Sequence, residues 1–260
     1  MPTPKNILLT GASRGIGLAI ANFLLKQNHK LFLVARTAAP LESLKREFPG
    51  QVEFLAADVG DLEIGPKAIS LALSAFTTLD ALILNHGTLM PVKRIADSTP
   101  EEWRKTYDVN FFSLLGFIQP AIPVLRASKG RIIFTSSGAS SNTYSTWGAY
   151  GSSKAAMNHL AGTIATEEPL ITTVSVRPGV VDTDMQVEVR GAHGVMDVKD
   201  ADKFKSLFEE GKLLKPEQPG NVMGRLAVSA AEGLSGKFLS WNDKELAAYQ
   251  DGGSIATLSC

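Results

Sequence analysis

The chain has 260 residues, of which 44% are hydrophobic and 20% are charged. This balance is ordinary for a globular domain and argues against a disordered or a fibrous protein. The 26 Lys and Arg residues are matched by 26 Asp and Glu residues, so the chain has no net positive charge that would attract nucleic acid or an anionic membrane. We therefore expect small-molecule ligands, with no nucleic acid and no membrane among the partners.

The cysteine content and the N-terminal residues indicate a compartment. Cys260 is the single cysteine, so no internal disulfide can form, which fits a reducing environment. The N-terminal residues lead directly into a strand, without the long apolar region of a signal peptide, and we find no apolar run of membrane-spanning length. The expected location is cytoplasmic.

Apolar runs and helical periodicity alternate along the whole chain. Residues 6–10 form a short, mostly apolar run that ends at Gly11, which is typical of a strand buried on both faces of a parallel sheet. Apolar residues then recur at helical spacing from Ile16 to Leu24 and lead to a second strand, which completes a βαβ unit. The later strands are expected at residues 31–35, 52–56, 79–84, 130–135, 172–176 and 236–240.

Helices are expected between these strands. One begins near Pro40, because proline is favoured in the first turn of a helix. Residues 101–126 form a long helix that Pro120 and Pro123 should kink or shorten near its end, and residues 149–166 form another. The alternation predicts one α/β domain over residues 1–260. This is a Rossmann fold with a doubly wound, seven-stranded parallel sheet, helices on both faces, and ligands bound beyond the C-terminal ends of the strands.

A glycine-rich segment lies between the first strand and the first helix. Its residues are Thr10, Gly11, Ala12, Ser13, Arg14, Gly15, Ile16 and Gly17. Glycines at this place let backbone amides approach a phosphate at the N-terminus of a helix, so the segment is interpreted as a dinucleotide site. The spacing differs from the G-x-G-x-x-G fingerprint. A tight strand-to-helix turn that needs small residues is the alternative.

Tyr150 and Lys154 stand four residues apart within one expected helix. Both side chains therefore lie on the same face, about one turn from each other. A nearby ammonium group stabilises a phenolate and so lowers the pKa of a tyrosine toward a range that is useful for proton transfer. The two residues are candidate catalytic residues, and an ordinary pair on the surface of a helix is the alternative.

Further motifs follow one another in a specific order. They are Gly11, Gly15 and Gly17, then Asp58, Asn85, Asn110, Ser137, Tyr150 and Lys154, and finally Arg177-Pro178-Gly179-Val180-Val181-Asp182-Thr183. From roughly Lys5 to Ser240 this pattern resembles the short-chain dehydrogenase/reductase family. The resemblance implies an oxidoreductase that uses a nicotinamide cofactor.

The resemblance assigns a role to each residue of the expected active site. Tyr150 is the general acid that protonates a carbonyl oxygen, and Lys154 lowers its pKa and binds the nicotinamide ribose. Ser137 orients the carbonyl, with Ser136 as the alternative. Asn110 supports a water-mediated proton relay to Lys154, and a polar residue that merely bends a helix is its alternative. Because hydride transfer builds negative charge on the substrate oxygen, donors from Ser137 and Tyr150 would act where that charge develops.

The resemblance also implies the residues that hold the cofactor. Besides the glycine-rich segment they are Asp58 and Val59 beneath the adenine, Asn85 and Gly87 in the turn after the fourth strand, and the catalytic Tyr150 and Lys154. Pro178 and Gly179 follow, with Val181 and Thr183 at the positions that fix the nicotinamide carboxamide. The turn at Asn85 departs from the family pattern Asn-Asn-Ala-Gly, because Leu84 replaces an asparagine and His86 replaces the alanine. Some of the backbone support in that turn must therefore differ.

The residues after the second strand decide the expected form of the cofactor. Rossmann proteins that prefer NAD usually carry an acidic residue here, whereas this chain has Arg36 and Thr37. Arg36 and Arg14 would hold a 2′-phosphate by charge-assisted hydrogen bonds, and Thr37 adds a donor. NADP(H) is therefore the expected cofactor. The alternative is that Arg36 only solvates the end of a strand.

No metal site is expected. The histidines His29, His86, His159 and His193 are scattered without the spacing of metal ligands, and no Cys/His cluster occurs in the sequence. These four residues are interpreted as structural or exposed.

These features predict an NADPH-dependent carbonyl reductase. Residues 35–37, 185–219 and 236–243 look similar to small benzil reductases, with sepiapterin reductases as near neighbours, and this resemblance implies a ketone or diketone substrate. An NADP-dependent dehydrogenase of secondary alcohols would use the same residues and is an alternative. A non-catalytic NADP-sensing protein is a further alternative, although such a protein would have no need to keep Ser137, Tyr150 and Lys154.

The segment at about 185–219 is expected to act as a lid over the substrate. It begins just after Thr183 and combines glycines, which supply bendable backbone, with apolar residues. The apolar residues are Val187, Met196, Phe204, Leu207 and Phe208. A rigid pair of surface helices is the alternative.

The helices that carry Asn110 and Tyr150 predict a possible homodimer. They hold more apolar surface than one face of a sheet is expected to cover. The residues are Phe111, Phe112, Leu115, Phe117, Met157, Leu160 and Ile164. Ordinary packing in the core is the alternative.

Overall fold

The computed structural model describes residues 3–192 and 194–253, so His193 and Cys260 lie outside the described residues. The strands are β1 (Asn6–Thr10), β2 (Lys30–Ala35), β3 (Val52–Ala56), β4 (Ala81–Leu84), β5 (Arg131–Thr135), β6 (Thr172–Arg177) and β7 (Lys237–Ser240). The α-helices are α1 (Gly15–Leu25), α2 (Ala38–Glu47), α3 (Ile64–Phe76), α4 (Pro100–Tyr107), α5 (Ser113–Ser128), α6 (Gly148–Glu167), α7 (Asp184–Gly191), α8 (Val198–Glu209) and α9 (Glu217–Ser229). Shorter helical turns are η1 (Ile95–Asp97), the π-helical η2 (Asp108–Phe112), η3 (Gly138–Ser140), η4 (Glu232–Leu234) and η5 (Lys244–Tyr249).

The seven strands form one parallel sheet in the order β3-β2-β1-β4-β5-β6-β7. The central strand β1 pairs with β2 on one side, where Leu8 lies opposite Phe32, and with β4 on the other, where Leu8 lies opposite Leu82. The chain order reverses between β1 and β4, and ligands bind at such a switch point, beyond the C-terminal ends of the strands. The predicted Rossmann fold with a doubly wound, seven-stranded parallel sheet is confirmed.

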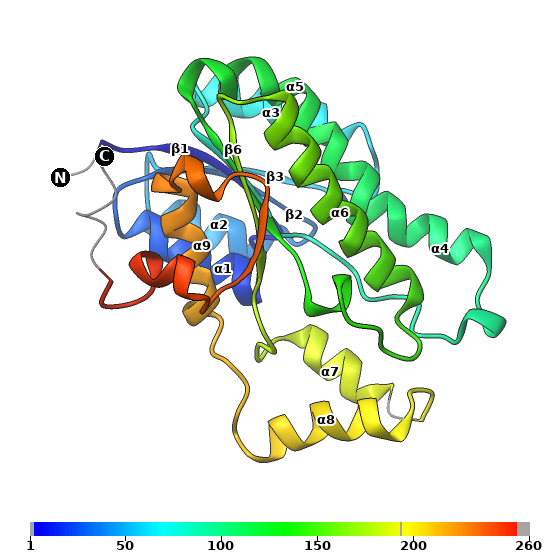
Figure 1. Cartoon of the computed structure of the whole chain (residues 1–260). Helices are drawn as coiled ribbons and strands as arrows, with labels where there is room; N and C mark the ends of the chain where they lie inside the picture. Colours follow the sequence, from blue (N-terminus) through cyan, green and yellow to red (C-terminus); the bar gives the residue numbers. More distant parts are fainter. Residues whose placement is uncertain (1–2, 193, 254–260) are drawn as a thin grey trace.

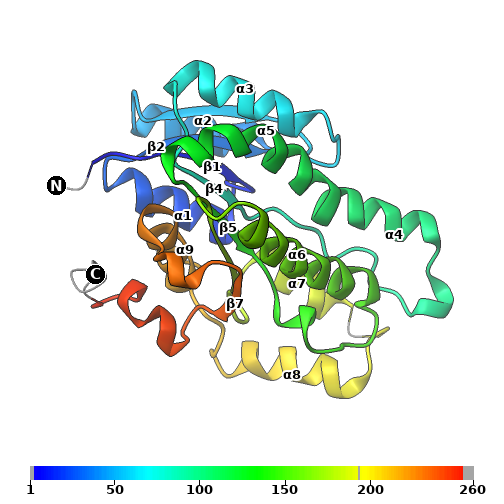
Figure 2. The same ribbon diagram turned by 45° about the horizontal axis from the view of Figure 1, so that its top comes forward.

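Helices cover both faces of the sheet (Figures 1 and 2). Ile7 and Leu9 of β1 belong to the core shared with α1, α2 and α9, whereas Leu8 belongs to the core shared with α3, α5 and α6. Successive residues of a strand point to opposite faces. All three side chains are fully buried because helices cover both of these faces. A strand covered on both faces must therefore be apolar at every position, which is the pattern that predicted it.

The long helix expected at residues 101–126 is present, but its irregular part is not at the prolines where it was predicted. The helical run extends without a break from Pro100 to Ser128, and its irregular part is the π-helical turn η2. Pro120 and Pro123 both lie inside α5 without ending it. Buried residues of α5, including Phe117, pack against the sheet beside these prolines, and such tertiary packing overrides local propensity.

The same helical run, Pro100–Ser128, is long and apolar enough by length and composition to cross a membrane. This differs from the expectation that the chain holds no apolar run of that length. The core helix of a soluble protein meets the same criterion, and Leu114, Phe117 and Leu125 of this run are fully buried in the core.

Candidate active site

The loops after six strands bring the predicted site residues to one edge of the sheet. The glycine-rich segment follows β1, Arg36 and Thr37 follow β2, Asp58 and Val59 follow β3, Asn85 and Gly87 follow β4, Ser137 follows β5, and residues 178–183 follow β6. Because the strands are parallel, all six loops lie at the C-terminal edge. Helices α6 and η2 add Tyr150, Lys154 and Asn110 to this edge.

Tyr150 lies in the first turn of α6 and is 6% exposed. Burial raises the pKa of its phenol, and a hydrogen bond with the Ser137 side chain lowers it in part. The Lys154 ammonium group lies 5.9 Å from the centre of the Tyr150 ring. The two side chains share one site as predicted, but the pKa of Tyr150 is raised rather than lowered. The phenol therefore holds its proton at neutral pH.

Lys154 explains this difference. Its side chain is 3% exposed, and Nζ donates to the Thr135 carbonyl oxygen at 2.8 Å. Burial lowers the pKa of Lys154 to about 8. An ammonium directed at a backbone carbonyl at the end of β5 is not directed at the phenol oxygen, so burial dominates the pKa of Tyr150.

The serines after β5 have separate partners. The hydroxyl of Ser136 is buried and donates to Asn158 Oδ1 at 2.7 Å. The Ser137 oxygen accepts the backbone N–H of Ala139 at 3.1 Å, which caps η3, and this side chain contacts Tyr150. The geometry therefore favours Ser137 over Ser136 as the residue beside the general acid.

Asn110 is fully buried in the π-helical turn η2. Its Oδ1 accepts the backbone N–H of Thr88 at 2.8 Å, and its Nδ2 donates to the Thr88 carbonyl at 2.9 Å and to Ser153 Oγ at 3.1 Å. Gly87 lies between this amide and the ammonium, because a Cβ on Gly87 would be 3.3 Å from Lys154 Nζ and 3.4 Å from Asn110 Oδ1. The predicted pair of Asn110 and Lys154 is thus brought together across Gly87.

The glycine-rich segment forms a cradle that side chains would fill. A Cβ on Gly17 would lie 2.1 Å from the Gly11 carbonyl oxygen, and one on Gly15 would lie 3.0 Å from Thr183 Cγ2. Gly11 and Gly15 also adopt φ angles of +68° and +52°, a region that favours glycine. The cradle lies at the N-terminus of α1, where backbone N–H groups and the helix dipole favour phosphate. These residues fit a dinucleotide cofactor.

The remaining predicted cofactor residues surround this cradle. The half-buried Ser13 and Ile16 belong to the segment itself, and Asn85 Nδ2 donates to the Gly11 carbonyl at 3.3 Å. Asp58 is exposed and accepts the backbone N–H of Gly60 at 3.0 Å, whereas Val59 is buried. The exposed Arg36 and Thr37 follow β2.

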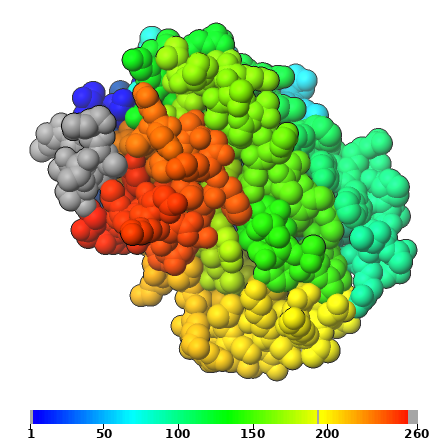
Figure 3. Space-filling view, viewed as in Figure 1, coloured from blue at the N-terminus to red at the C-terminus, as the bar shows by residue number. Residues whose placement is uncertain are grey.

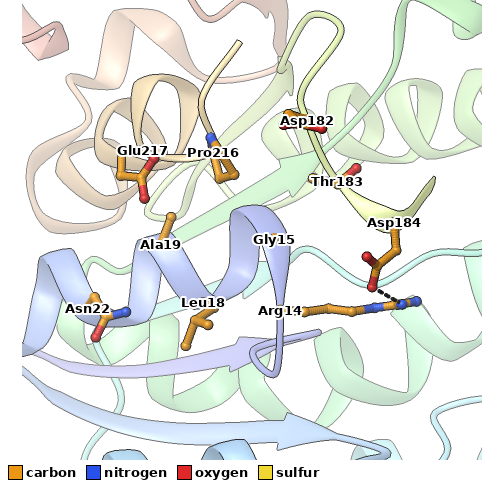
Figure 4. A pocket seen from close by; sticks show the side chains of 10 residues that line it. All are labelled: Arg14, Gly15, Leu18, Ala19, Asn22, Asp182, Thr183, Asp184, Pro216 and Glu217. Carbon is orange, nitrogen blue, oxygen red and sulfur yellow. Dashed lines mark hydrogen bonds and ion pairs between the residues drawn. The ribbon is translucent and has the colours of Figure 1, made fainter. Parts of the chain in front are cut away.

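Arg14 has a partner that the sequence did not predict. Its guanidinium group forms an ion pair with Asp184, at the start of α7 (Figure 4). The two residues help to line a pocket of about 280 Å³ between the start of α1, the loop after β6 and the start of α9. Tyr150 does not line this pocket. Both members of the pair are more than half exposed, so the interaction is weak enough for Arg14 to exchange partners.

The loop after β6 anchors the segment at 185–219. Val181 pairs with Leu214, and the backbone N–H of Asp182 donates to the Leu214 carbonyl at 2.8 Å. Gly179 lies beneath this bridge with φ +81°, and a Cβ there would be 2.6 Å from Leu214 Cδ1. Pro178 is buried beside it. The two ends of the segment are therefore held together next to the cofactor residues.

Residues of helices α7 and α8 share a buried cluster with Tyr150. The two helices lie together at one end of the molecule, where their surface meets that of the segment before α6 (Figures 1 and 3). Phe204 of α8 stacks on Trp147 at 5.2 Å between ring centres, and Trp147 meets the Tyr150 ring edge-to-face at 5.7 Å. Met196 is buried in the same cluster. Of the other predicted lid residues, Leu207 is half-buried, and Val187 and Phe208 are largely exposed.

Sequence reasoning did not single out Trp147 and Tyr144 as parts of this site. Trp147 stands three residues before Tyr150, a spacing that places two residues on the same helix face, so a signal existed. Tyr144 contacts both Trp147 and Phe204, and no local pattern indicates a contact between residues 60 positions apart. Within residues 3–192 and 194–253, no group of three or more His, Cys, Asp or Glu residues could hold a metal ion.

The family model of the short chain dehydrogenases matches residues 5–194. The chain belongs to this family. A benzil reductase of Saccharomyces cerevisiae that forms (S)-benzoin is 38% identical over 261 residues, which cover 95% of this chain and 99% of that protein. The crystal structure of a short chain dehydrogenase/reductase from Saccharomyces cerevisiae is 37% identical, has a TM-score of 0.92, and matches over 95% of this chain and 99% of that one.

A more distant structure shows a bound cofactor. L-Sorbose reductase from Gluconobacter frateurii, solved in complex with NADPH and L-sorbose, is 25% identical with a TM-score of 0.78, over 92% of this chain and 95% of that one. This chain is thus a short-chain oxidoreductase that acts on CH–OH or C=O groups, in a family that uses NAD(P)(H).

We expect substitutions of Ser137 and Ser136 to show which of the two hydroxyls contributes to turnover and which to stability. Ser137→Ala should lower kcat by roughly a hundredfold or more, because it removes a donor at the substrate oxygen. Ser136→Ala should leave kcat within about threefold and lower the free energy of unfolding by roughly 1 kcal/mol, because it breaks one buried hydrogen bond. Steady-state kinetics and urea unfolding of both variants check this, and the reverse order of kcat values would contradict it.

Proposed function

We propose that this short-chain oxidoreductase is an NADPH-dependent carbonyl reductase. The observation that carries the proposal is the buried phenol of Tyr150, which hydrogen-bonds with Ser137 and has the Lys154 ammonium group 5.9 Å from its ring centre. A protonated phenol is the form that can donate a proton to a carbonyl oxygen. The cofactor supplies the hydride when it is bound.

The residues of the site divide the remaining work. Tyr150 donates its proton to the substrate oxygen, and Ser137 donates a hydrogen bond to the same oxygen, so both act where negative charge develops. Lys154 lies beside the ring of Tyr150 and has a pKa of about 8, so it is charged at neutral pH. Asn110 holds the Thr88 backbone and faces Lys154 across Gly87, which fits its predicted role in returning a proton to the site.

The aromatic cluster over Tyr150 favours an apolar, aromatic ketone or diketone. Trp147 and Phe204 are buried against Tyr150, and Tyr144 packs on both. Such surfaces bind apolar rings and exclude water from a reacting carbonyl. The benzil reductase of Saccharomyces cerevisiae supports the same substrate class. A dehydrogenase of secondary alcohols would use the same residues in the reverse direction, and the benzil reductase relative favours reduction.

NADPH is the proposed form of the cofactor. Among the described residues no ion pair involves Arg36, and the exposed ion pair of Arg14 with Asp184 is weak enough to be exchanged, so both guanidinium groups can meet a 2′-phosphate. Thr37 is exposed beside Arg36. The NADPH complex of L-sorbose reductase supports this choice.

The segment at 185–219 is proposed to act as a lid. Phe204 and Met196 belong to the buried cluster that contains Tyr150, so movement of this segment would open the surface beside the tyrosine. Gly191, Gly194 and Gly211 have open space around them, which allows the backbone to bend there. The covered position also fits the alternative of two helices packed rigidly on the core.

A homodimer is proposed through a smaller surface than the sequence indicated. Phe117, Met157 and Ile164 are buried in the core, so they are not available to a partner. Phe112 is 43% exposed, and Phe111, Leu115 and Leu160 are half-buried. These four residues on α5, η2 and α6 remain as the candidate surface. We likewise propose a cytoplasmic location, which the single cysteine supports.

The activity itself is tested with Tyr150→Phe. The wild-type protein should oxidise NADPH in the presence of aromatic ketones or diketones, benzil among them, as followed by NADPH absorbance. The variant should bind NADPH normally but lose turnover by a factor on the order of a hundred or more, because the acid is gone and the packing is kept. Tyr249→Phe, which removes a hydroxyl that bonds the Ser229 and Ala231 backbone, is the control. Turnover near the wild-type value in Tyr150→Phe would disprove the mechanism.

The choice of cofactor is tested with Arg36→Asp. A carboxylate repels the 2′-phosphate and accepts hydrogen bonds from a free ribose, so the ratio of kcat/KM for NADPH over NADH should fall below one. Arg46→Asp, exposed on α2, should leave the ratio unchanged. If Arg36→Asp still prefers NADPH tenfold, which is about 1.4 kcal/mol, another residue discriminates between the cofactors.

The lid is tested by limited digestion with trypsin. Lys199, Lys203 and Lys205 lie exposed on α8, and cleavage of a helix requires local opening. We expect NADPH together with an aromatic ketone to slow cleavage at these sites, while cleavage at Arg46 on α2 stays constant. Equal rates at the α8 sites with and without ligands would favour the rigid arrangement.

A further inference from the structure

His86 occupies the position where the family pattern has alanine. Its side chain is 7% exposed, and it lies between the C-terminal end of β1 and the π-helical turn η2, with its ring 6.0 Å from that of Phe117. A buried imidazole must have partners for its polar nitrogens. Both nitrogens of His86 have one.

The neighbours of His86 fix where its proton lies. The Ser113 hydroxyl donates its single proton to the Val109 carbonyl at 2.7 Å, so the Ser113 oxygen must accept from His86 Nε2, 2.8 Å away. Nε2 therefore carries the ring proton, and Nδ1 is an acceptor. The Thr10 hydroxyl lies 2.7 Å from Nδ1 and 3.3 Å from the Ile83 carbonyl. We assign its proton to Nδ1, because Nδ1 is the nearer acceptor and needs a donor.

The contacts extend this arrangement at both ends. The Thr10 oxygen accepts the backbone N–H of Asn85 at 3.0 Å, so the bonds run in one direction from Asn85 through Thr10, His86 and Ser113 to Val109. We call these five residues the His86 chain. It joins the end of β1, which leads into the glycine-rich segment, to the residue directly before Asn110.

The π-helical turn at the end of the His86 chain needs hydrogen bonds from outside the turn. The backbone N–H of Ser113 donates to the Asp108 carbonyl five residues earlier, so the Val109 carbonyl accepts the Ser113 hydroxyl rather than the Ser113 N–H. A π-helical turn is a rare conformation that neighbouring contacts must stabilise. The loop after β4 contacts this turn twice, through His86 to Ser113 and through the Thr88 backbone to Asn110.

We propose that His86 is a positioning residue of the reaction: through Ser113 it holds the π-helical turn so that Asn110 faces Lys154, and through Thr10 it ties that turn to the glycine-rich segment. The proposal rests on the carbonyl reductase function proposed above. An alanine at this position has no polar atom in its side chain and would leave Thr10 and Ser113 without their shared partner.

The His86 chain requires a neutral imidazole ring, because an imidazolium has no acceptor at Nδ1. Burial, and to a lesser degree the charge of Lys154, lower the pKa of His86 to about 3, while a hydrogen bond at the Val109 backbone and the charge of Asp58 raise it. The ring is therefore neutral at neutral pH. In the unfolded chain an ordinary histidine gains a proton below about pH 6.5, so the contribution of His86 to stability is lost as the pH falls from there toward about 3.

Kinetics of variants test the positioning role. His86→Ala should lower kcat on the order of tenfold or more with the KM for the ketone within about threefold, because Asn110 is displaced and the substrate surface is not. His86→Gln keeps an amide donor for Ser113 and should recover most of kcat. Ile69→Ala is the control for destabilisation alone. Ile69 is a buried core residue on α3 that is not part of the site, so its variant should lose stability without this loss of kcat.

Two further readouts need no turnover and so separate this proposal from the proposed function. The effects of His86→Ala and Ser113→Ala on the free energy of unfolding should be strongly non-additive, and the loss of wild-type stability between about pH 6.5 and pH 4 should be smaller in His86→Gln. Additive effects, equal pH dependence, or a wild-type kcat in His86→Ala would overturn the positioning role. A wild-type protein that reduces no carbonyl compound would overturn the proposed function, while the coupling and the pH dependence would still decide whether the chain exists.

Discussion

The burial of the Lys154 ammonium group constrains the whole site. A charged amine that is 3% exposed must be compensated by nearby acceptors, and the Thr135 carbonyl at the end of β5 is the acceptor in the structure. The sheet therefore has to end where that carbonyl points toward α6. A glycine at position 87 leaves room for the ammonium group, because a Cβ there would lie 3.3 Å from Nζ and would press on it. A neighbouring histidine must stay neutral, because a second positive charge in the same buried region would be unfavourable. The buried charge thus constrains the end of β5, the turn after β4 and the neighbouring histidine together.

The cofactor side of the site depends on a different constraint, which is the close approach of two backbone segments. The segment after β1 turns so tightly that the carbonyl of Gly11 would meet any side chain on Gly17. Asn85, at the end of the neighbouring strand β4, donates to the same carbonyl and accepts the Thr135 hydroxyl of β5. Three adjacent strands are therefore joined at the place where the sheet order reverses. These bonds hold the cradle in place without a ligand, as in the largely pre-formed sites of small molecules.

Much of the fold and of the site could be predicted from the sequence, because the relevant signals are local. A strand such as β1, buried on both faces, is apolar throughout, and Tyr150 and Lys154 stand one helical turn apart. What could not be predicted depends on contacts distant in sequence. Burial in a cluster that includes Phe204 of α8 raises the pKa of Tyr150, and Arg14 is paired with a residue 170 positions later. The π-helical turn could not be predicted because the residues that stabilise it lie on β1 and after β4. The prolines, which predicted a kink or an early end of the helix, are tolerated because of packing against the sheet.

The bridge between Val181 and Leu214 has a consequence for how the family can diversify. Two backbone hydrogen bonds, from Asp182 to Leu214 and from Leu214 to Val180, close the intervening segment into a loop whose ends are adjacent. The entropy of closing a loop changes only slowly with its length once its ends are fixed. Residues within the segment can therefore be inserted, deleted or exchanged with little strain on β6 or on the cofactor cradle. A change of sequence confined to this closed stretch of chain can therefore alter the surface beside Tyr150 without moving the sheet.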